Sequence, residues 1–280
     1  MDNGRLATFL FTVDADWIPG SHRGLERLLD LCARLRAKAT IFTTGKFALA
    51  YPDLIQGAHA DGHEIGTHGW QHPMPATRFE NYRLAPDAQR REWLSRATEA
   101  IAHVTSVEPR AFRAPFLWID GRTFRLLEEF RYHIDSSIPT RRFDGLVGMV
   151  NYPHYFWAAL EPYHPHLDRP HRRGNSSILE VPPSAYLLPL NMSTLRFLGL
   201  RTSLLLLRVL ARRSPVLNFY CHPWEFVSPD DGLEFPADAP LRHRRGTGPH
   251  LLEPLGTFLE AVLHHGFRSG TVSEVAASAW

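Results

Sequence analysis

Short apolar runs alternate with amphipathic stretches along the chain, a pattern typical of βα units around a parallel sheet or barrel. Apolar runs predict eight strands, at residues 7–13, 39–43, 63–66, 111–113, 133–135, 178–181, 216–221 and 267–270. Apolar residues at helical spacing predict helices over 25–35, 85–103 and 251–263, and Gly266 is a plausible stop after the third. No internal repeat is visible. The pattern therefore predicts an α/β fold built on a parallel sheet.

Two stretches interrupt the alternation. Residues 136–177 are irregular and rich in His, Pro and aromatic side chains, and residues 229–248 are polar and Arg-rich. Loops of this length are usually disordered or functional. The many aromatics of the first stretch favour an ordered cap. We therefore expect a single domain over residues 1–280, with a capping insertion at 136–177.

The composition of the 280 residues excludes some functions. The formal charge is +2, from 31 basic and 29 acidic residues, which gives no electrostatic case for nucleic-acid binding. Cys32 and Cys221 are far apart and form no disulfide or zinc pattern. The longest dense apolar stretch, residues 204–207, is far shorter than the roughly 20 residues of a membrane span. With no signal-peptide pattern at the start, we expect a cytoplasmic protein.

Two acids end the first predicted strand. Asp14 and Asp16 follow an apolar run and precede Trp17. The carboxyl ends of parallel strands are where active sites collect in barrels and open α/β sheets. One aspartate there would more often cap a helix, but two acids beside an aromatic leave the catalytic and structural interpretations equally open.

A pair of histidines follows the third predicted strand. His68 and His72 are four residues apart, so on one helical turn their imidazoles would face the same way. Two neutral imidazoles and one carboxylate make a facial metal-binding set that leaves positions open for water and substrate. This spacing alone is a weak signal. Downstream of the two aspartates, however, the pair becomes a candidate partner for Asp16.

Three more strand ends supply polar groups: Arg113, Asp135 and His222. A single histidine or acid at a strand end is more often structural than catalytic. Five strand ends that each deliver an acid, a histidine or an arginine to one rim are unlike a chance arrangement, so we expect them to form one site.

With these residues in order, the sequence resembles the NodB-homology polysaccharide deacetylases, carbohydrate esterase family 4, from Leu6 to about Val275. The similar motifs are Thr12-Val-Asp14-Ala-Asp16, the His68/His72 pair, Arg113-Ala-Pro-Phe116, Asp135 and His222. Two features depart from the family pattern: the second acid of the first motif is displaced by one residue, and Leu117 stands where a glycine normally follows. The resemblance implies a distorted (β/α) barrel of about seven strands.

The resemblance also implies roles in the metal-assisted hydrolysis of an N-acyl amide. Asp14 would be the general base and His222 the general acid. The backbone N–H of Phe116 would hold the oxyanion, Arg113 would pair with Asp14, and Asp135 would orient Arg113 or its neighbours. One divalent metal ion would be held by Asp16, His68 and His72. Zinc is the default, and cobalt, nickel and iron suit the same ligands. The substrate would be an acylated aminosugar or glycan.

Local sequence is also similar to a branch of exopolysaccharide deacetylases and lipid-linked aminosugar deformylases. The stretch 195–213 is basic and amphipathic, so it could lie on an anionic membrane surface, or it could be an outer barrel helix. In the first case a lipid-linked sugar becomes the natural substrate. Trp17, Trp70 and Trp224 lie near the motifs and could stack on a sugar ring, or pack at the barrel rim.

Two alternatives stay open. One is an allantoinase-like hydrolase of a non-sugar amide. The other is a catalytically inactive carbohydrate-binding barrel, against which the complete set of acids and histidines argues.

Overall fold

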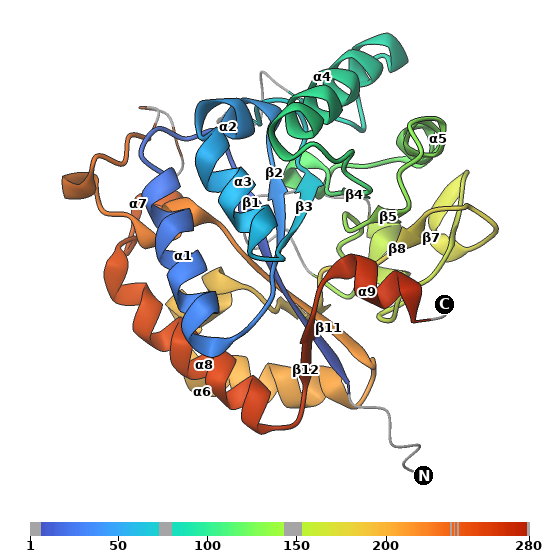
Figure 1. Cartoon of the computed structure of the whole chain (residues 1–280). Helices are drawn as coiled ribbons and strands as arrows, with labels where there is room; N and C mark the ends of the chain where they lie inside the picture. Colours follow the sequence, from blue (N-terminus) through green and yellow to red (C-terminus); the bar gives the residue numbers. More distant parts are fainter. Residues whose placement is uncertain are drawn as a thin grey trace.

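Eight parallel strands form one curved sheet with helices packed on its outside (Figure 1). The computed structural model describes residues 7–72, 80–142, 153–235, 237, 239 and 241–278. The strand order is β11-β1-β2-β3-β4-β5-β8, and β12 pairs with β1. The strands are β1 (Thr8–Ala15), β2 (Thr40–Thr43), β3 (Glu64–Thr67), β4 (Ala111–Phe112), β5 (Ile134–Asp135), β8 (Leu179–Glu180), β11 (Val216–Cys221) and β12 (Arg268–Gly270). All eight predicted strands are confirmed, to within two residues at each end.

Burial explains why these segments read as continuous apolar runs. Every residue of β1 and β11 is buried, as expected for parallel strands covered on both faces. The helices around the sheet are α1 (His22–Leu35), α2 (Gly45–Ala50), α3 (Pro52–Ala60), α4 (Asp87–Thr105), α5 (Gly121–Glu129), α6 (Met192–Ala211), α7 (Leu241–Arg244), α8 (Leu252–His264) and α9 (Val272–Ala277). The three predicted helices correspond to α1, α4 and α8.

The expected insertion is described at residues 136–142 and 153–177; residues 143–152 lie outside the described part. It contains a 3-10 turn (Pro153–Trp157) and a hairpin of β6 (Pro165–His166) and β7 (Arg169–Arg173). Tyr155 and Tyr163 are buried in an apolar cluster with residues of α5 and β4. The hydroxyl of Tyr155 donates to the carbonyl of Ile119, at 2.8 Å. The described parts of the insertion are therefore packed onto the barrel.

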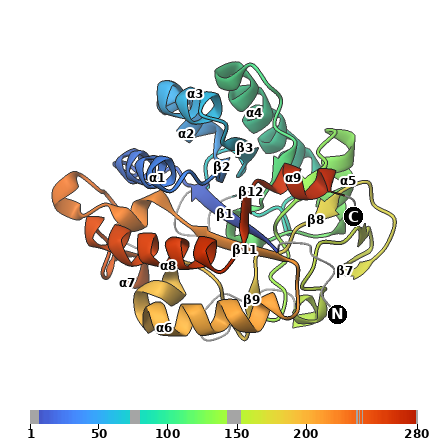
Figure 2. The same ribbon diagram turned by 60° about the horizontal axis from the view of Figure 1, so that its bottom comes forward.

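Helix α6 lies beside α8 along the outside of the sheet (Figure 2). Leu195, Leu206, Leu207 and Leu210 are buried against the barrel, as expected for an outer barrel helix. Gly199 has φ +80° and interrupts the helix. Within the described ranges, no helix combines the length and apolarity needed to cross a bilayer.

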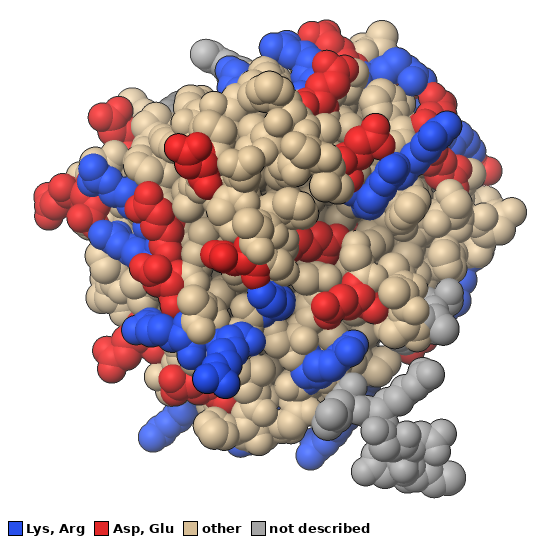
Figure 3. Space-filling model, in the orientation of Figure 1, with Lys and Arg blue, Asp and Glu red and all other residues tan. Residues whose placement is uncertain are grey.

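Side chains of both charges are interspersed on the face shown in Figure 3. That distribution agrees with the small net charge of +2. This face therefore offers no extended basic surface of the kind that nucleic-acid binding needs.

Close packing of α1 on the 3-10 turn Pro223–Phe226 sets the position of the segment that carries His222. A Cβ added at Gly24 of α1 would lie 1.8 Å from the carbonyl oxygen of Pro223. We expect Gly24→Ala to lower the free energy of unfolding by about 1–3 kcal/mol, because the turn must move. Gly57→Ala is the matched control, since nothing lies within 4 Å of its added Cβ. Urea unfolding of both variants measures the effect, and equal stability of the two would contradict this packing.

Candidate metal centre and catalytic rim

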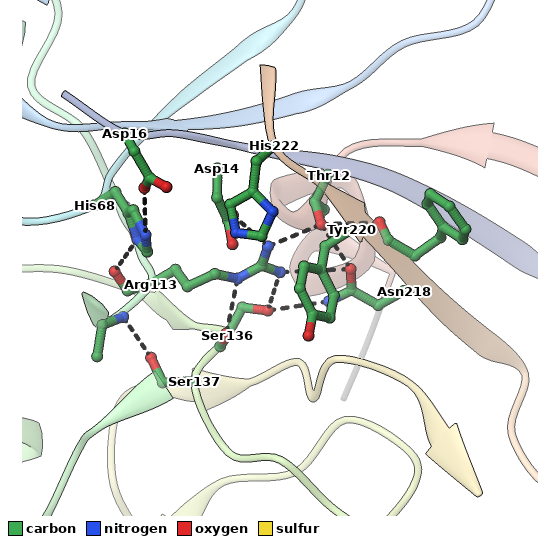
Figure 4. A network of polar contacts seen from close by, with 12 residues as sticks. Thr12, Asp14, Asp16, His68, Arg113, Ser136, Ser137, Asn218, Tyr220 and His222 are labelled. Carbon is green, nitrogen blue, oxygen red and sulfur yellow. Dashed lines mark hydrogen bonds and ion pairs between the residues drawn. The ribbon is translucent and has the colours of Figure 1, made fainter. Parts of the chain in front are cut away.

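Three side chains from the carboxyl ends of β1 and β3 converge on one point. Figure 4 shows two of them, Asp16 and His68, facing each other. Asp16 follows β1, His68 follows β3, and His72 lies in the loop beyond it. One ligand atom from each lies within 4.8 Å of the other two, and all three residues are buried. These are the three residues that the resemblance assigns to a metal ion.

Hydrogen bonding fixes which nitrogen of His68 faces this point. The carbonyl oxygen of Arg113 lies 2.8 Å from Nδ1, so Nδ1 carries the proton that is donated to it. Nε2 of His68 then faces Oδ1 of Asp16 at 3.4 Å, and Nε2 of His72 lies 3.9 Å from the same oxygen. Three possible ligand atoms therefore face one another, an arrangement that a cation between them would stabilise.

The charge states of the group also suit a metal. Burial lowers the pKa of His72 to about 4, so its imidazole is neutral at pH 7, as a ligand must be. Burial alone would raise the pKa of Asp16, but the imidazoles of His72, His68 and His222 lower it well below its ordinary value. Indole Nε1 of Trp224 donates to Oδ2 of Asp16 at 3.2 Å. Two imidazoles and a carboxylate fit zinc, cobalt, nickel and iron alike.

A buried carboxylate shapes the loop that carries His72. Glu80 accepts hydrogen bonds from the backbone N–H groups of Trp70, Gln71 and His72, the last at 2.7 Å. His72 itself has φ +37°, a conformation that costs energy in a non-glycine residue. Glu80 stabilises this turn and is 2% exposed. No spacing or motif distinguishes it in the sequence, so sequence reasoning missed it.

Arg113 lies at the centre of the barrel and holds the second aspartate of the site. Its Nη1 donates to Oδ1 of Asp14 at 2.7 Å and to the hydroxyl of Thr12 at 2.9 Å. Its Nε and Nη2 donate to the backbone oxygen and the hydroxyl of Ser136. The structure thus brings Asp14 and Arg113 together, with Arg113 fully buried.

Asp135 makes no hydrogen bond to Arg113 within the described residues; it acts on the neighbouring backbone. Its carboxylate accepts from the N–H and the hydroxyl of Ser137, and that hydroxyl accepts from the N–H of Ala114 at 2.8 Å. Asp135 also shares a hydrogen bond with the buried Glu180 of β8. Burial and the neighbouring Asp135 raise the pKa of Glu180 well above its ordinary value, so we assign the shared proton to Glu180.

His222 follows β11 on the same rim as Asp14 and Asp16. Its ring stacks on Trp224, with the centroids 5.0 Å apart. Burial lowers its pKa, but the hydrogen bond to Glu225 and the charges of Asp16 and Asp14 outweigh burial and raise it to about 9. His222 is therefore protonated at pH 7, the state that a proton donor needs.

The aromatic residues considered for substrate binding differ in their contacts and in their burial. The ring centroids of Phe116 and His72 are 4.3 Å apart. Phe116 and Leu117 have left-handed backbone conformations, with φ +56° and +58°. The left-handed conformation at Leu117 explains why a glycine suits this position. Trp17 packs against the core and Trp70 lies under the guanidinium of Arg96. Of the two possibilities left open for Trp224, packing at the barrel rim agrees with its burial, because it is 2% exposed.

Sequence comparison shows which family the chain is similar to. The profile of the family described as polysaccharide deacetylase matches residues 4–134. A chitin deacetylase of Colletotrichum lindemuthianum is 28% identical over 125 residues, which are 42% of this chain and 48% of that protein. The chain spans less than half the length of the curated relatives first matched.

Solved structures show the same fold. A polysaccharide deacetylase-type protein from Mycobacterium smegmatis superposes with a TM-score of 0.66 at 21% identity, over 99% of this chain and 91% of that one. Puue allantoinase superposes with a TM-score of 0.64 at 19% identity, over 98% and 91%. This likeness confirms the distorted (β/α) barrel predicted from the sequence.

The shared proton of Asp135 and Glu180 predicts a pH-dependent stability. Because the folded pKa of Glu180 is raised, the native protein keeps a proton that the unfolded chain loses above its ordinary pKa of 4.5. Wild-type stability should therefore fall as pH rises through this window, while Glu180→Gln lacks that loss. Between pH 5 and 7 the variant should gain up to about 1.4 kcal/mol per pH unit relative to wild type. Urea unfolding at both pH values tests this, and a pH-independent difference would contradict it.

Proposed function

We propose that the chain is a metal-dependent N-deacylase that removes an acetyl or formyl group from an aminosugar. The observation that carries the proposal is the convergence of Asp16, His68 and His72 beside a separate carboxylate, Asp14, and a separate protonated imidazole, His222. The similarity to the polysaccharide deacetylase family and to a chitin deacetylase supports amide hydrolysis on sugars. The substrate and the metal dependence are part of the proposal.

Each group has a task that its surroundings suit. A divalent ion on Asp16, His68 and His72 would supply an acidified water and a Lewis acid for the amide carbonyl. Asp14, oriented by Arg113, takes a proton from the attacking water. The backbone N–H of Phe116 is the proposed donor to the developing oxyanion, and one such donor is typically worth about 3 kcal/mol.

His222 completes the reaction by protonating the leaving nitrogen as the carbon–nitrogen bond breaks. The bonding pair goes to nitrogen, and the imidazolium becomes a neutral imidazole. The two proton transfers leave Asp14 protonated and His222 neutral, and exchange with solvent restores both. Its pKa of about 9 keeps His222 in the donating form at pH 7.

Substitution of the base and of one ligand tests the proposal. We expect Asp14→Asn to keep the metal but to lose about 10²–10⁴ in kcat, and His68→Ala to lose both metal and activity. The measurements are metal content by mass spectrometry and release of acetate and formate from a panel of N-acylated aminosugars. His264→Ala, an exposed surface histidine, is the control. Undiminished turnover by Asp14→Asn would remove the assigned base.

The same panel distinguishes the two alternatives. Small ureides such as allantoin belong in it, because the allantoinase fold is shared. Turnover of ureides without turnover of acylated sugars would identify a non-sugar amidase. Metal binding without turnover of any acylated amine would identify an inactive carbohydrate-binding barrel.

We further propose that the substrate is lipid-linked and that α6 contacts an anionic bilayer. Between Glu180 and Glu225 the sequence carries five arginines and no acidic residue. The outer side of α6 exposes Phe197, Leu198 and Leu205, which are 52%, 48% and 61% exposed. Arg196 is paired with Glu225, whereas Arg201, Arg208, Arg212 and Arg213 are exposed. Exposed apolar side chains near these four arginines complement an anionic lipid surface.

Vesicle binding tests this contact. Wild type should sediment with vesicles containing phosphatidylglycerol more than with phosphatidylcholine alone, and Leu205→Asp should weaken that binding several-fold, because it places a charge among the lipids. Leu84→Asp is the matched control, since Leu84 is 69% exposed elsewhere on the surface. Equal binding by both variants, or none by wild type, would contradict the proposed contact.

A further inference from the structure

Glu225 is a buried acid directly behind the proposed proton donor, with no task in the mechanism above. It is 1% exposed. Its Oε2 accepts a hydrogen bond from the backbone N–H of His222 at 3.0 Å and lies 3.4 Å from Nδ1 of the same residue. Its Oε1 lies 3.6 Å from Nη1 of Arg196, on the inner side of α6. Glu225 thus connects the imidazole of His222 to a buried cation on a neighbouring helix.

Closing the 3-10 turn Pro223–Phe226 is one structural task of Glu225, but that task does not need its charge. A glutamine has a carbonyl oxygen that could accept from the same backbone N–H of His222. Burying a carboxylate is far more costly than burying an amide. The contact with Nδ1 of His222 is the one that benefits from the negative charge, because it stabilises the imidazolium form.

The ring of His222 is constrained from three sides. Nδ1 faces Glu225, one face of the ring stacks on Trp224, and Tyr220 packs edge-on with its centroid 6.0 Å away. With Nδ1 occupied, Nε2 is the nitrogen left for a substrate.

The charged and titratable groups around this imidazole come from several elements. The electrostatic neighbours of His222 are Glu225 on its own turn, Asp14 and Asp16 from β1, and His72 from the loop after β3. Arg196 of α6 acts on Glu225. Asp14 and Asp16 are committed to the attacking water and to the metal in the proposed mechanism. Glu225 is therefore the acid whose negative charge remains available to His222.

We propose that Glu225, held in place by Arg196, is a positioning residue that orients His222 and keeps it protonated for donation to the leaving nitrogen. This inference rests on the proposed deacylase function. In the donation step the Nε2–H bond of His222 breaks, a bond from hydrogen to the leaving nitrogen forms, and the carboxylate of Glu225 stays ionised throughout. Arg196 keeps that carboxylate turned toward Nδ1.

The leaving group provides a readout that a purely structural role would not move. An amine must be protonated to depart, whereas 4-nitrophenolate departs without a proton. We expect Glu225→Gln to lower kcat on the N-acylated aminosugar by about 10–10², part of the usual contribution of one proton donor, and to change 4-nitrophenyl acetate hydrolysis less than about twofold. The alkaline limb of the amide pH–rate profile should move to lower pH. Equal losses on both substrates, or none on either, would overturn the proposal.

A second measurement separates this inference from the proposed function. In the zinc-loaded protein, ¹⁵N NMR follows the titration of the His222 imidazole without any substrate. We expect His222 to titrate at a pH at least one unit lower in Glu225→Gln than in wild type, and to be unchanged in Glu64→Gln. Glu64 is a control because it is a half-buried, hydrogen-bonded acid at the amino end of β3, the end opposite to the site. An unchanged titration in Glu225→Gln would overturn the inference, whereas absence of deacylase activity in wild type would overturn the proposed function alone.

Discussion

The guanidinium group of Arg113 is the interaction on which the site depends. A fully buried cation is tolerated only when its donors are paired, and here the partners come from β1 and from the residue after β5. The ring of Phe42 from β2 lies 4.3 Å from the guanidinium carbon, and Asn218 of β11 faces it as well. Removing one charged partner of such a group typically costs about 3–5 kcal/mol. Short strands such as β4 and β5 are thereby joined to the long central strands.

This one residue also sets two features of the chemistry. Its side chain orients the carboxylate of Asp14, while its backbone carbonyl accepts from Nδ1 of His68 and so directs Nε2 toward Asp16. The same residue, Arg113, therefore orients both the proposed base, Asp14, and one proposed metal ligand, His68. The remaining groups are held by other buried acids: Glu80 under the loop of His72, and Glu225 behind His222. Glu80 holds the backbone of the His72 loop, and Glu225 faces the imidazole of His222.

The sequence predicted the fold well because its strands are short apolar runs bounded by polar residues, a signal that needs no tertiary information. It also predicted which residues meet, since the carboxyl ends of parallel strands lie on one edge; Asp16, His68 and His72 do converge. Glu80, Glu180 and Glu225 escaped prediction because their meaning comes from contacts with distant backbone and side chains. The sequence left the role of the tryptophans open for the same reason: proximity to a motif does not tell whether a ring is exposed. Trp224 is buried, and its indole supports Asp16 instead of facing a substrate.

The central claim is that Asp16, His68 and His72 hold one divalent cation, and anomalous diffraction tests it most directly. Crystals soaked in a zinc salt, measured on both sides of the zinc absorption edge, should show one strong peak about 2.0–2.3 Å from a carboxylate oxygen of Asp16 and from Nε2 of both histidines. A zinc peak coordinated by other groups, or no peak between these three side chains, would contradict the account.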